Sequence, residues 1–182
     1  YNGETYLREA IDSIYAQTYQ NWEVIFWDNS STDNTAKIAK SYDDRLKYFK
    51  SDKTTPLGEA RSLALNEAKG DYLSFLDCDD CLFPNKFKIQ VEILEKNPSI
   101  YLLFSSYDVI DARGILKRDF YVPDNNSVNF CSIIKRYPIN QQTVLFRKKV
   151  LDNQHIFINK LLTYSPDYDF FMLTSLESPF RK

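Results

Sequence analysis

The chain has 182 residues, of which 43% are hydrophobic and 26% charged, with a formal net charge of -2 at pH 7. This length and composition suit one globular domain with a sizeable core, and the balanced charge gives no electrostatic footprint for nucleic acid. No apolar run approaches the roughly 20 residues of a membrane span. The 3 cysteines are too few for a disulfide framework and favour a reducing compartment, with the cytoplasm as the default.

Helical and extended patterns alternate along the first two-thirds of the chain. Apolar residues at helical spacing predict helices at 7–14, 30–42, 60–68 and 84–94, with a loop at 52–58 before the third. Gly70 follows the third helix, and Pro84 opens the fourth. Apolar runs between the helices predict strands at 22–27, 46–49, 72–76 and 100–105. This β–α alternation predicts an α/β domain with a mostly parallel sheet and helices on both faces.

The pattern weakens after about residue 110. A turn at 111–114 separates short strands near Val109 and at 120–122, and a loop follows at 123–126. A further strand is expected at 143–146, and a loop from Tyr164 leads into a last helix. There are no internal repeats, so we expect a single domain over 1–182 with a division near residue 110.

The strand at 72–76 ends in three carboxylates, Asp77, Asp79 and Asp80. Like charges about 4 Å apart repel by roughly 4 kcal/mol at an effective dielectric near 20, so a compensating partner is expected. A divalent cation is the simplest one, because carboxylate oxygens suit magnesium or manganese and leave coordination positions for substrate phosphates. A solvated acidic turn is the alternative interpretation.

A second strand, at 22–27, also ends in an acid, Asp28. In doubly wound sheets, ligands bind beyond the carboxyl ends of the strands, so Asp28 and the Asp77 cluster predict one shared site. Two further acids, Asp167 and Asp169, stand at the start of the last helix. Their simplest role is to interact with the helix dipole.

Other site classes lack the residues they need. Cys78 and Cys81 form a C-x-x-C pattern, but only Cys131 and His155 remain as further zinc ligands, without motif spacing. Acids between the two cysteines raise the thiol pKa, unlike a redox dithiol. No nucleophilic triad can be built around the single histidine. A nucleotidyltransferase would need a glycine-rich phosphate loop, and the chain has 4 Gly.

The motifs, taken in order, resemble those of the family-2 glycosyltransferases, inverting enzymes with the GT-A fold. The resembling segments are Tyr1-Asn2-Gly3-Glu4, Trp27-Asp28-Asn29-Ser30-Ser31-Thr32-Asp33, Leu57-Gly58-Glu59-Ala60-Arg61, Phe75-Leu76-Asp77-Cys78-Asp79-Asp80 and Asp167-Tyr168-Asp169-Phe170-Phe171. The resemblance implies a Rossmann-like nucleotide-diphospho-sugar transferase. Residues 1–110 would bind the nucleotide sugar, and residues 111–182 would bind the acceptor and carry the catalytic base.

The family has a strand immediately before the position of Tyr1, inside the sheet. The chain opens at Tyr1 and closes at Lys182 just after a helix, so we expect a fragment truncated at both ends. The strands ending at Asp28 and Asp77 should then flank an empty slot.

The resemblance also implies residue roles. Asp79, with Asp77 and Asp80, faces a bound Mn²⁺ or Mg²⁺, and Asp77 also lies near the ribose. The nucleotide-sugar contacts come from Tyr1, Asp28, Asn29, Arg61 and Asp77, with the ring of Tyr1 available to stack on the base. Asn29 departs from the Asp often found there, although its amide oxygen still accepts hydrogen bonds. Arg61 is expected in the first turn of its helix, where the dipole disfavours a cation, and a surface arginine is its alternative role.

Asp167 corresponds to the general base, although Pro166 replaces the Glu that often precedes it. The implied activity is inverting transfer of a hexosyl or hexosaminyl group to a hydroxyl of a saccharide or lipid-linked acceptor. A UDP-sugar is the donor that the resemblance favours. The implied setting is bacterial cell-envelope polysaccharide biosynthesis, in the cytoplasm or peripherally at the inner face of the membrane. The alternative is a catalytically inactive nucleotide-sugar-binding or assembly domain of the same fold.

Overall fold

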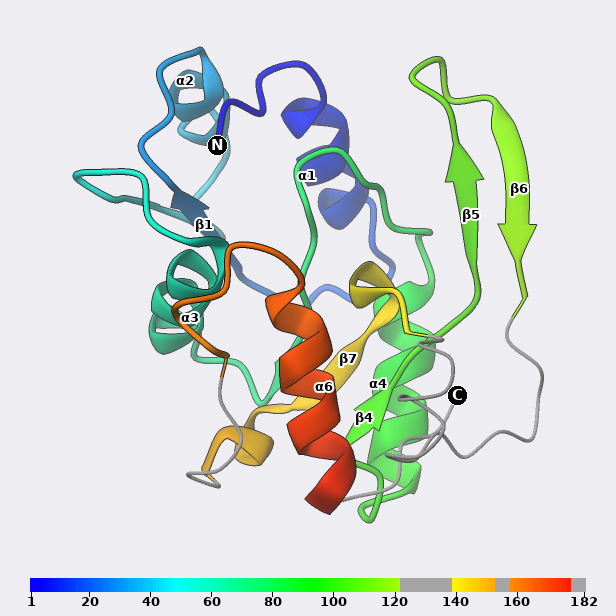
Figure 1. The fold of residues 1–182 in the computed structure, drawn as a ribbon. Helices are drawn as coiled ribbons and strands as arrows, with labels where there is room; N and C mark the ends of the chain where they lie inside the picture. Colours follow the sequence, from blue (N-terminus) through cyan, green and yellow to red (C-terminus); the bar gives the residue numbers. More distant parts are fainter. Residues whose placement is uncertain (122–138, 153–157, 178–182) are drawn as a thin grey trace.

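The computed structural model of the chain describes residues 1–121, 139–152 and 158–177 (Figure 1). The helices are α1 (Leu7–Tyr15), α2 (Thr35–Ala39), α3 (Leu57–Glu67), α4 (Lys86–Lys96) and α6 (Pro166–Glu177), with 3-10 turns η1 (Gln141–Thr143) and η2 (Lys148–Asp152). The strands are β1 (Val24–Asp28), β2 (Leu46–Lys50), β3 (Tyr72–Leu73), β4 (Leu102–Leu103), β5 (Tyr107–Ile110), β6 (Leu116–Phe120) and β7 (Leu145–Arg147). Within these ranges no helix is both long and apolar enough to cross a bilayer.

Some element ends differ from those that the sequence predicts. The helix expected from Pro84 begins at Lys86, because the carbonyl of Pro84 accepts a hydrogen bond from the backbone N–H of Thr18 at 2.9 Å instead of starting the helix. The strands expected at 72–76 and 100–105 pair only over two residues each, because their shared partner β7 is itself short. The loop expected at 123–126 lies outside the described residues.

Strand direction is more varied than the apolar pattern indicates. β1 and β2 are parallel, whereas β7 lies antiparallel between β3 and β4. β3 and β4 therefore run parallel to each other, as expected of strands joined through a helix. The antiparallel hairpin β5–β6 stands to one side (Figure 1), and its turn at 111–114 is closed by Gly114 with φ 74°.

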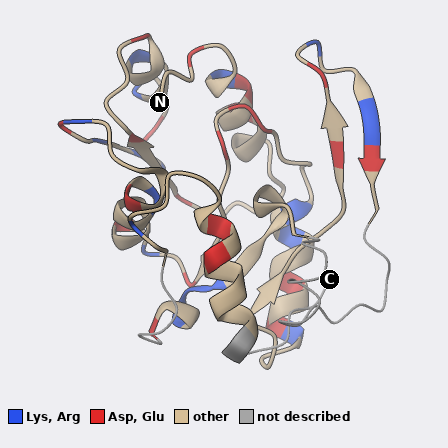
Figure 2. Ribbon diagram, in the orientation of Figure 1, with Lys and Arg blue, Asp and Glu red and all other residues tan. Residues whose placement is uncertain are grey.

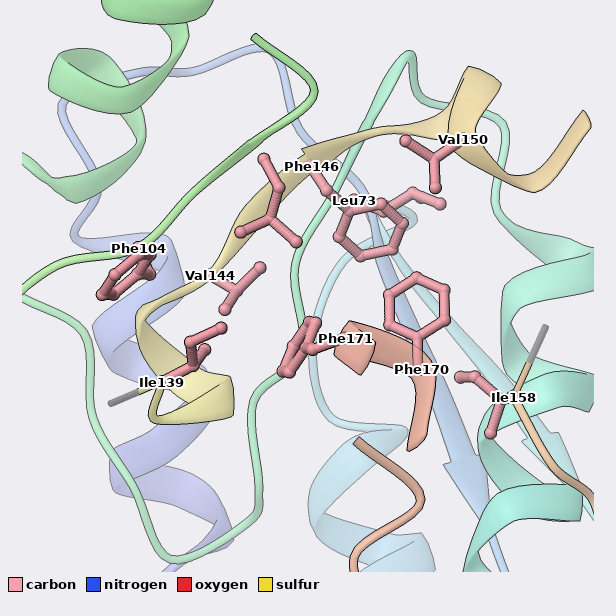
Figure 3. Close-up of a cluster of buried hydrophobic side chains, with 10 residues drawn as sticks. Leu73, Phe104, Ile139, Val144, Phe146, Val150, Ile158, Phe170 and Phe171 are labelled. Carbon is pink, nitrogen blue, oxygen red and sulfur yellow. The ribbon is translucent and has the colours of Figure 1, made fainter. Parts of the chain in front are cut away.

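The three-stranded sheet is covered on both faces, because successive strand residues point to opposite sides. Leu73, Leu102 and Phe146 join an apolar cluster in which Phe170 and Phe171 of α6 are buried (Figure 3). The opposite face packs against α4 through Tyr72, Leu103, Leu145 and Leu94. This confirms the expected helices on both faces. The burial of Phe170 and Phe171 also anchors α6 one turn beyond Asp167.

The pair β1–β2 forms a separate sheet, against which α1 and α2 pack through Leu7, Ile11 and Ala39. In the described part of the chain no hydrogen-bonded register joins β1 to β3. The strands leading to Asp28 and Asp77 therefore belong to different sheets. The strand expected between them stays a prediction.

The first turn of α3 is fitted closely against the segment that leads to α6. The backbone N–H of Gly58 donates to the carbonyl of Leu162 at 2.9 Å, and a Cβ at this position would lie 2.0 Å from the carbonyl oxygen of Asn159. A methyl group cannot fit there without moving backbone.

We therefore expect Gly58→Ala to lower the free energy of unfolding by about 3 kcal/mol, because overpacked sites commonly cost this much. The melting temperature should fall by roughly 6–12 °C, since each kcal/mol shifts a domain of this size by about 2–4 °C. Thermal unfolding followed by circular dichroism measures the shift. Gly70→Ala is the matched control, because its Cβ would meet its nearest neighbour, the carbonyl of Tyr72, at 3.3 Å. Equal shifts in the two variants would contradict the expectation.

The ammonium group of Lys86 is buried and donates to the hydroxyl of Ser74 at 3.2 Å and the carbonyl of Val144 at 3.3 Å. Burial lowers the pKa of Lys86 from 10.5 to about 7. At pH values between these two, the unfolded chain binds a proton at Lys86 that the folded chain lacks. The stability of the folded state therefore rises with pH across this window.

Lys86→Met removes this titration. We therefore compare the free energies of unfolding of the two chains. The value for the unmutated chain minus that for the variant should increase by up to about 1.4 kcal/mol per pH unit between about pH 7 and pH 10. Urea unfolding at successive pH values measures both chains. A difference that stays constant over this range would show that Lys86 keeps its ordinary pKa in the folded chain.

Candidate functional site

A cavity of about 350 Å³ opens where α3, the segment after β3, η1 and the start of α6 meet. Its lining is mostly polar and consists of Leu57, Arg61, Asp77, Ile139, Asn140, Gln141, Gln142 and Asp167. Figure 2 shows acidic residues in the first turns of α6, and one of them, Asp167, lines the cavity. The cavity thus joins residues from both predicted parts of the domain.

Arg61 lines the cavity and contacts two of its acids. Its Nη2 is 3.0 Å from Asp77 Oδ1, and its Nη1 is 3.8 Å from Asp167 Oδ1. The arginine side chain is only 11% exposed, and its guanidinium carbon lies 5.9 Å from the centre of the Phe75 ring. One cation therefore holds together two acids that the sequence places 90 residues apart.

The structure contradicts the alternative role of Arg61 and its expected place in the helix. It is not a surface arginine, because its side chain is almost fully covered. It also lies in the second turn of α3, which begins at Leu57, so a conflict with the helix dipole no longer argues for a ligand role. Its contacts with Asp77 and Asp167 argue for that role instead.

Gln142 also contacts the acidic motif. Its Nε2 donates to Asp77 Oδ2 at 2.6 Å. Burial raises the pKa of Asp80, the charges of Asp79 and Asp77 raise it further, and a hydrogen bond with Gln142 opposes the rise. The sequence signal for this residue was weak: two adjacent glutamines directly before a buried strand, with nothing to indicate where they point.

The acidic motif fits a cation that is shared with a ligand. Asp79 is exposed, whereas Asp77 is held by Arg61 and Gln142. Among the described side chains, no group of three or more Asp, Glu, His or Cys is arranged to hold a metal ion. An ion held by one or two carboxylates together with phosphate oxygens and water is the usual arrangement for magnesium in nucleotide sites. The donor set is therefore compatible with a phosphate-bridged ion and not with an all-protein cage.

The residues expected around the nucleoside form a second group outside the cavity lining. Asp28 is 1% exposed, and its carboxylate accepts hydrogen bonds from Ser31 N at 2.7 Å and from the Tyr48 hydroxyl at 2.6 Å. Burial alone would raise the pKa of Asp28, but the bonds from Ser31 and Tyr48 and the nearby charge of Lys50 hold it below its usual range. The carboxylate of Asp28 therefore stabilises the loop after β1 through these hydrogen bonds.

The side chain of Asn29 also holds a loop through hydrogen bonds, in this case to the backbone of Thr55. Its Oδ1 accepts from Thr55 N at 3.0 Å, and its Nδ2 donates to the Thr55 carbonyl at 2.9 Å. Tyr1 is 63% exposed and lies beside this loop, because Asn2 N donates to the Ser31 hydroxyl at 2.9 Å. The structure therefore brings Tyr1, Asp28 and Asn29 into one neighbourhood, while Arg61, Asp77 and Asp167 meet in the cavity.

Cys78 and Cys81 are free thiols in this structure. Burial raises the pKa of Cys78, and the charges of Asp79 and Asp77 raise it further. A thiol with a raised pKa is a poor nucleophile at neutral pH. Cys131 and His155 lie outside the described residues.

Comparisons with known proteins place this geometry in a family context. The sequence profile described as "Glycosyl transferase family 2" matches residues 1–157. An uncharacterized glycosyltransferase of Rickettsia felis is 35% identical over 176 residues, which are 93% of this chain and 29% of that protein. The Escherichia coli protein named UDP-Glc:alpha-D-GlcNAc-diphosphoundecaprenol beta-1,3-glucosyltransferase WfgD is 31% identical over 153 residues, or 84% of this chain and 59% of that protein.

Among solved structures, S. aureus TarS 1-349 in complex with UDP matches with a TM-score of 0.80 and 25% identity, covering 98% of this chain and 53% of that one. This match confirms the expected GT-A fold. The chain spans less than two thirds of the length of these relatives.

Proposed function

The chain belongs to glycosyltransferase family 2, and on that premise we propose that it transfers a sugar from a nucleotide-diphosphate sugar to an acceptor hydroxyl with inversion. The observation that carries this proposal is the pair of contacts from Arg61 to Asp77 and Asp167. An acid of the metal motif and the expected base must face the same reacting bond, and these contacts hold both at one cavity. A UDP-sugar is the proposed donor, because the name of WfgD specifies UDP-Glc and TarS is solved with UDP.

The donor side of the site has two parts in this proposal. Tyr1, Asp28 and Asn29 shape the pocket for the nucleoside, with the exposed ring of Tyr1 free to stack on the base. Asp79, supported by Asp77 and Asp80, faces the diphosphate. A Mn²⁺ or Mg²⁺ ion bound there would withdraw charge from the departing nucleoside diphosphate. Arg61 supplies a fixed positive charge beside the same phosphates.

The acceptor side depends on Asp167. Inversion requires the acceptor oxygen to attack the anomeric carbon from the face opposite the leaving diphosphate. A bond forms between that oxygen and the anomeric carbon, the bond to the phosphate oxygen breaks, and the hydroxyl proton passes to a carboxylate oxygen of Asp167. Phe170 and Phe171 anchor the next turn of α6 in the core, so Asp167 is held on a rigid element.

The proposed biological setting is supported by the names of the relatives. WfgD is named for a lipid-linked acceptor, so we propose a saccharide or lipid-linked acceptor and a role in cell-envelope polysaccharide synthesis. A hexosyl or hexosaminyl group is the sugar class in question. The proposed location is the cytoplasm or the inner face of the membrane.

Asp79→Ala should weaken manganese-dependent UDP binding by more than about tenfold, which is about 1.4 kcal/mol. The fold should be retained, because substitutions at exposed positions usually change stability by less than about 0.5 kcal/mol. Calorimetry with UDP, with and without Mn²⁺, measures the effect. Asp71→Ala is the matched control, since Asp71 is an exposed acid at the other end of β3. Undiminished binding by the Asp79 variant would remove this residue from the metal site.

Asp167→Asn should leave UDP affinity nearly unchanged and reduce transfer by about 10² to 10⁴, the usual range for loss of a general base. Single-turnover transfer from UDP-, GDP-, dTDP- and CMP-sugars, tested with Mn²⁺, measures the rate. Asp169→Asn is the control, because Asp169 shares the acidic first turn of α6. Equal rates in the two variants would return Asp167 to a helix-capping role, and no transfer by the unmutated chain would favour an inactive binding domain.

A further inference from the structure

We propose that Gln142 is a positioning residue for the acidic motif: together with Arg61 it holds Asp77 in place, so that Asp79 remains the open carboxylate for a divalent cation. This inference rests on the proposed function and deepens it. It assigns a role to a residue from the second part of the chain, 65 positions from Asp77.

The first support is that both oxygens of Asp77 have partners. Oδ1 lies 3.0 Å from Arg61 Nη2, and Oδ2 accepts from Gln142 Nε2 at 2.6 Å. The Asp77 side chain is 46% exposed, so packing alone would not fix its rotation. A donor on each carboxylate oxygen does fix it, and the two donors leave Asp77 with reduced capacity to bind a metal.

The second support is that Gln142 is held before any ligand arrives. Its backbone N–H donates to Asn140 Oδ1 at 3.0 Å, which caps the η1 turn. From the other side, Gln90 Nε2 of α4 donates to the carbonyl of Thr143 at 2.8 Å in the buried interior. A side chain projecting from a turn fixed at both ends loses little further freedom when a ligand binds.

The same turn is joined directly to the strand that carries the acids. The Ser74 hydroxyl donates to the Val144 carbonyl at 2.6 Å, and Lys86 Nζ donates to the same carbonyl at 3.3 Å. Ser74 stands three residues before Asp77, and Val144 two residues after Gln142. The segments that carry Asp77 and Gln142 are therefore joined by a second hydrogen bond, from Ser74 to Val144, close to the first.

The third support is the charge of the partner. An amide donates to a carboxylate without adding charge. A cation at this position would neutralise the motif and compete with a metal ion. Among the described residues, Arg61 forms an ion pair with Asp77, whereas Asp79 and Asp80 form none. The amide of Gln142 thus keeps the motif negative enough to attract a divalent ion.

The test compares two substitutions that a purely structural role would not separate. Gln142→Ala removes the donor, and the affinity for UDP in the presence of Mn²⁺ should fall by about 10- to 100-fold, the usual effect of removing a residue that orients a metal site. Gln142→Glu places a new carboxylate beside Asp77 and Asp80, and it should tighten the binding of Mn²⁺ alone by about tenfold because it adds an oxygen ligand.

Mn²⁺ alone is titrated by its electron paramagnetic resonance signal, and UDP with Mn²⁺ by calorimetry. Gln20→Ala, at an exposed glutamine outside the cavity, should match the unmutated chain in both. Weaker Mn²⁺ binding in both Gln142 variants, or no change in either, would overturn the positioning role. If the unmutated chain binds UDP with Mn²⁺ while the variants do not differ from it, the proposed function stands and only this inference fails. If the unmutated chain binds neither, both fail.

Discussion

The site depends on one guanidinium group. Arg61 is almost fully covered and lies between Asp77 and Asp167, which come from different elements. Without a cation between them, two carboxylates at one cavity would repel each other. The charge of Arg61 therefore allows the segment after β3 and the start of α6 to approach each other. The close fit of Gly58 against the backbone before α6 holds α3, which carries Arg61, beside the same helix.

The packing of the three-stranded sheet supports this arrangement. Insertion of β7 between β3 and β4 places η1 beside the end of β3, so Gln142 meets Asp77 across the cavity. On the face shown in Figure 3, the buried side chains of Phe170 and Phe171 pack α6 against the sheet. This packing fixes the direction in which the first turn of α6 points. The precision of the cavity thus comes from apolar packing, while its chemistry comes from a few polar residues at the rim.

The two groups of predicted site residues have different physical character. Asp28 and Asn29 use their polar atoms to hold neighbouring loops, so they shape a surface beside Tyr1. At the cavity, Arg61 pairs with Asp77 and Asp167, and Gln142 adds no charge, while no ion pair between described residues involves Asp79 or Asp80 of the same motif. A ligand with a nucleoside at one end and a diphosphate at the other would match both groups, and this is the donor class in the proposed function.

The sequence by itself determined the alternation of helices and strands and the acids at two strand ends, because these depend on local periodicity and residue type. It also carried the motifs of the family. Only the tertiary structure decided that β7 runs antiparallel, that Arg61 is covered, and that Gln142 reaches Asp77. Strand direction, burial and contacts over 65 residues depend on how distant segments pack, and local patterns do not encode them.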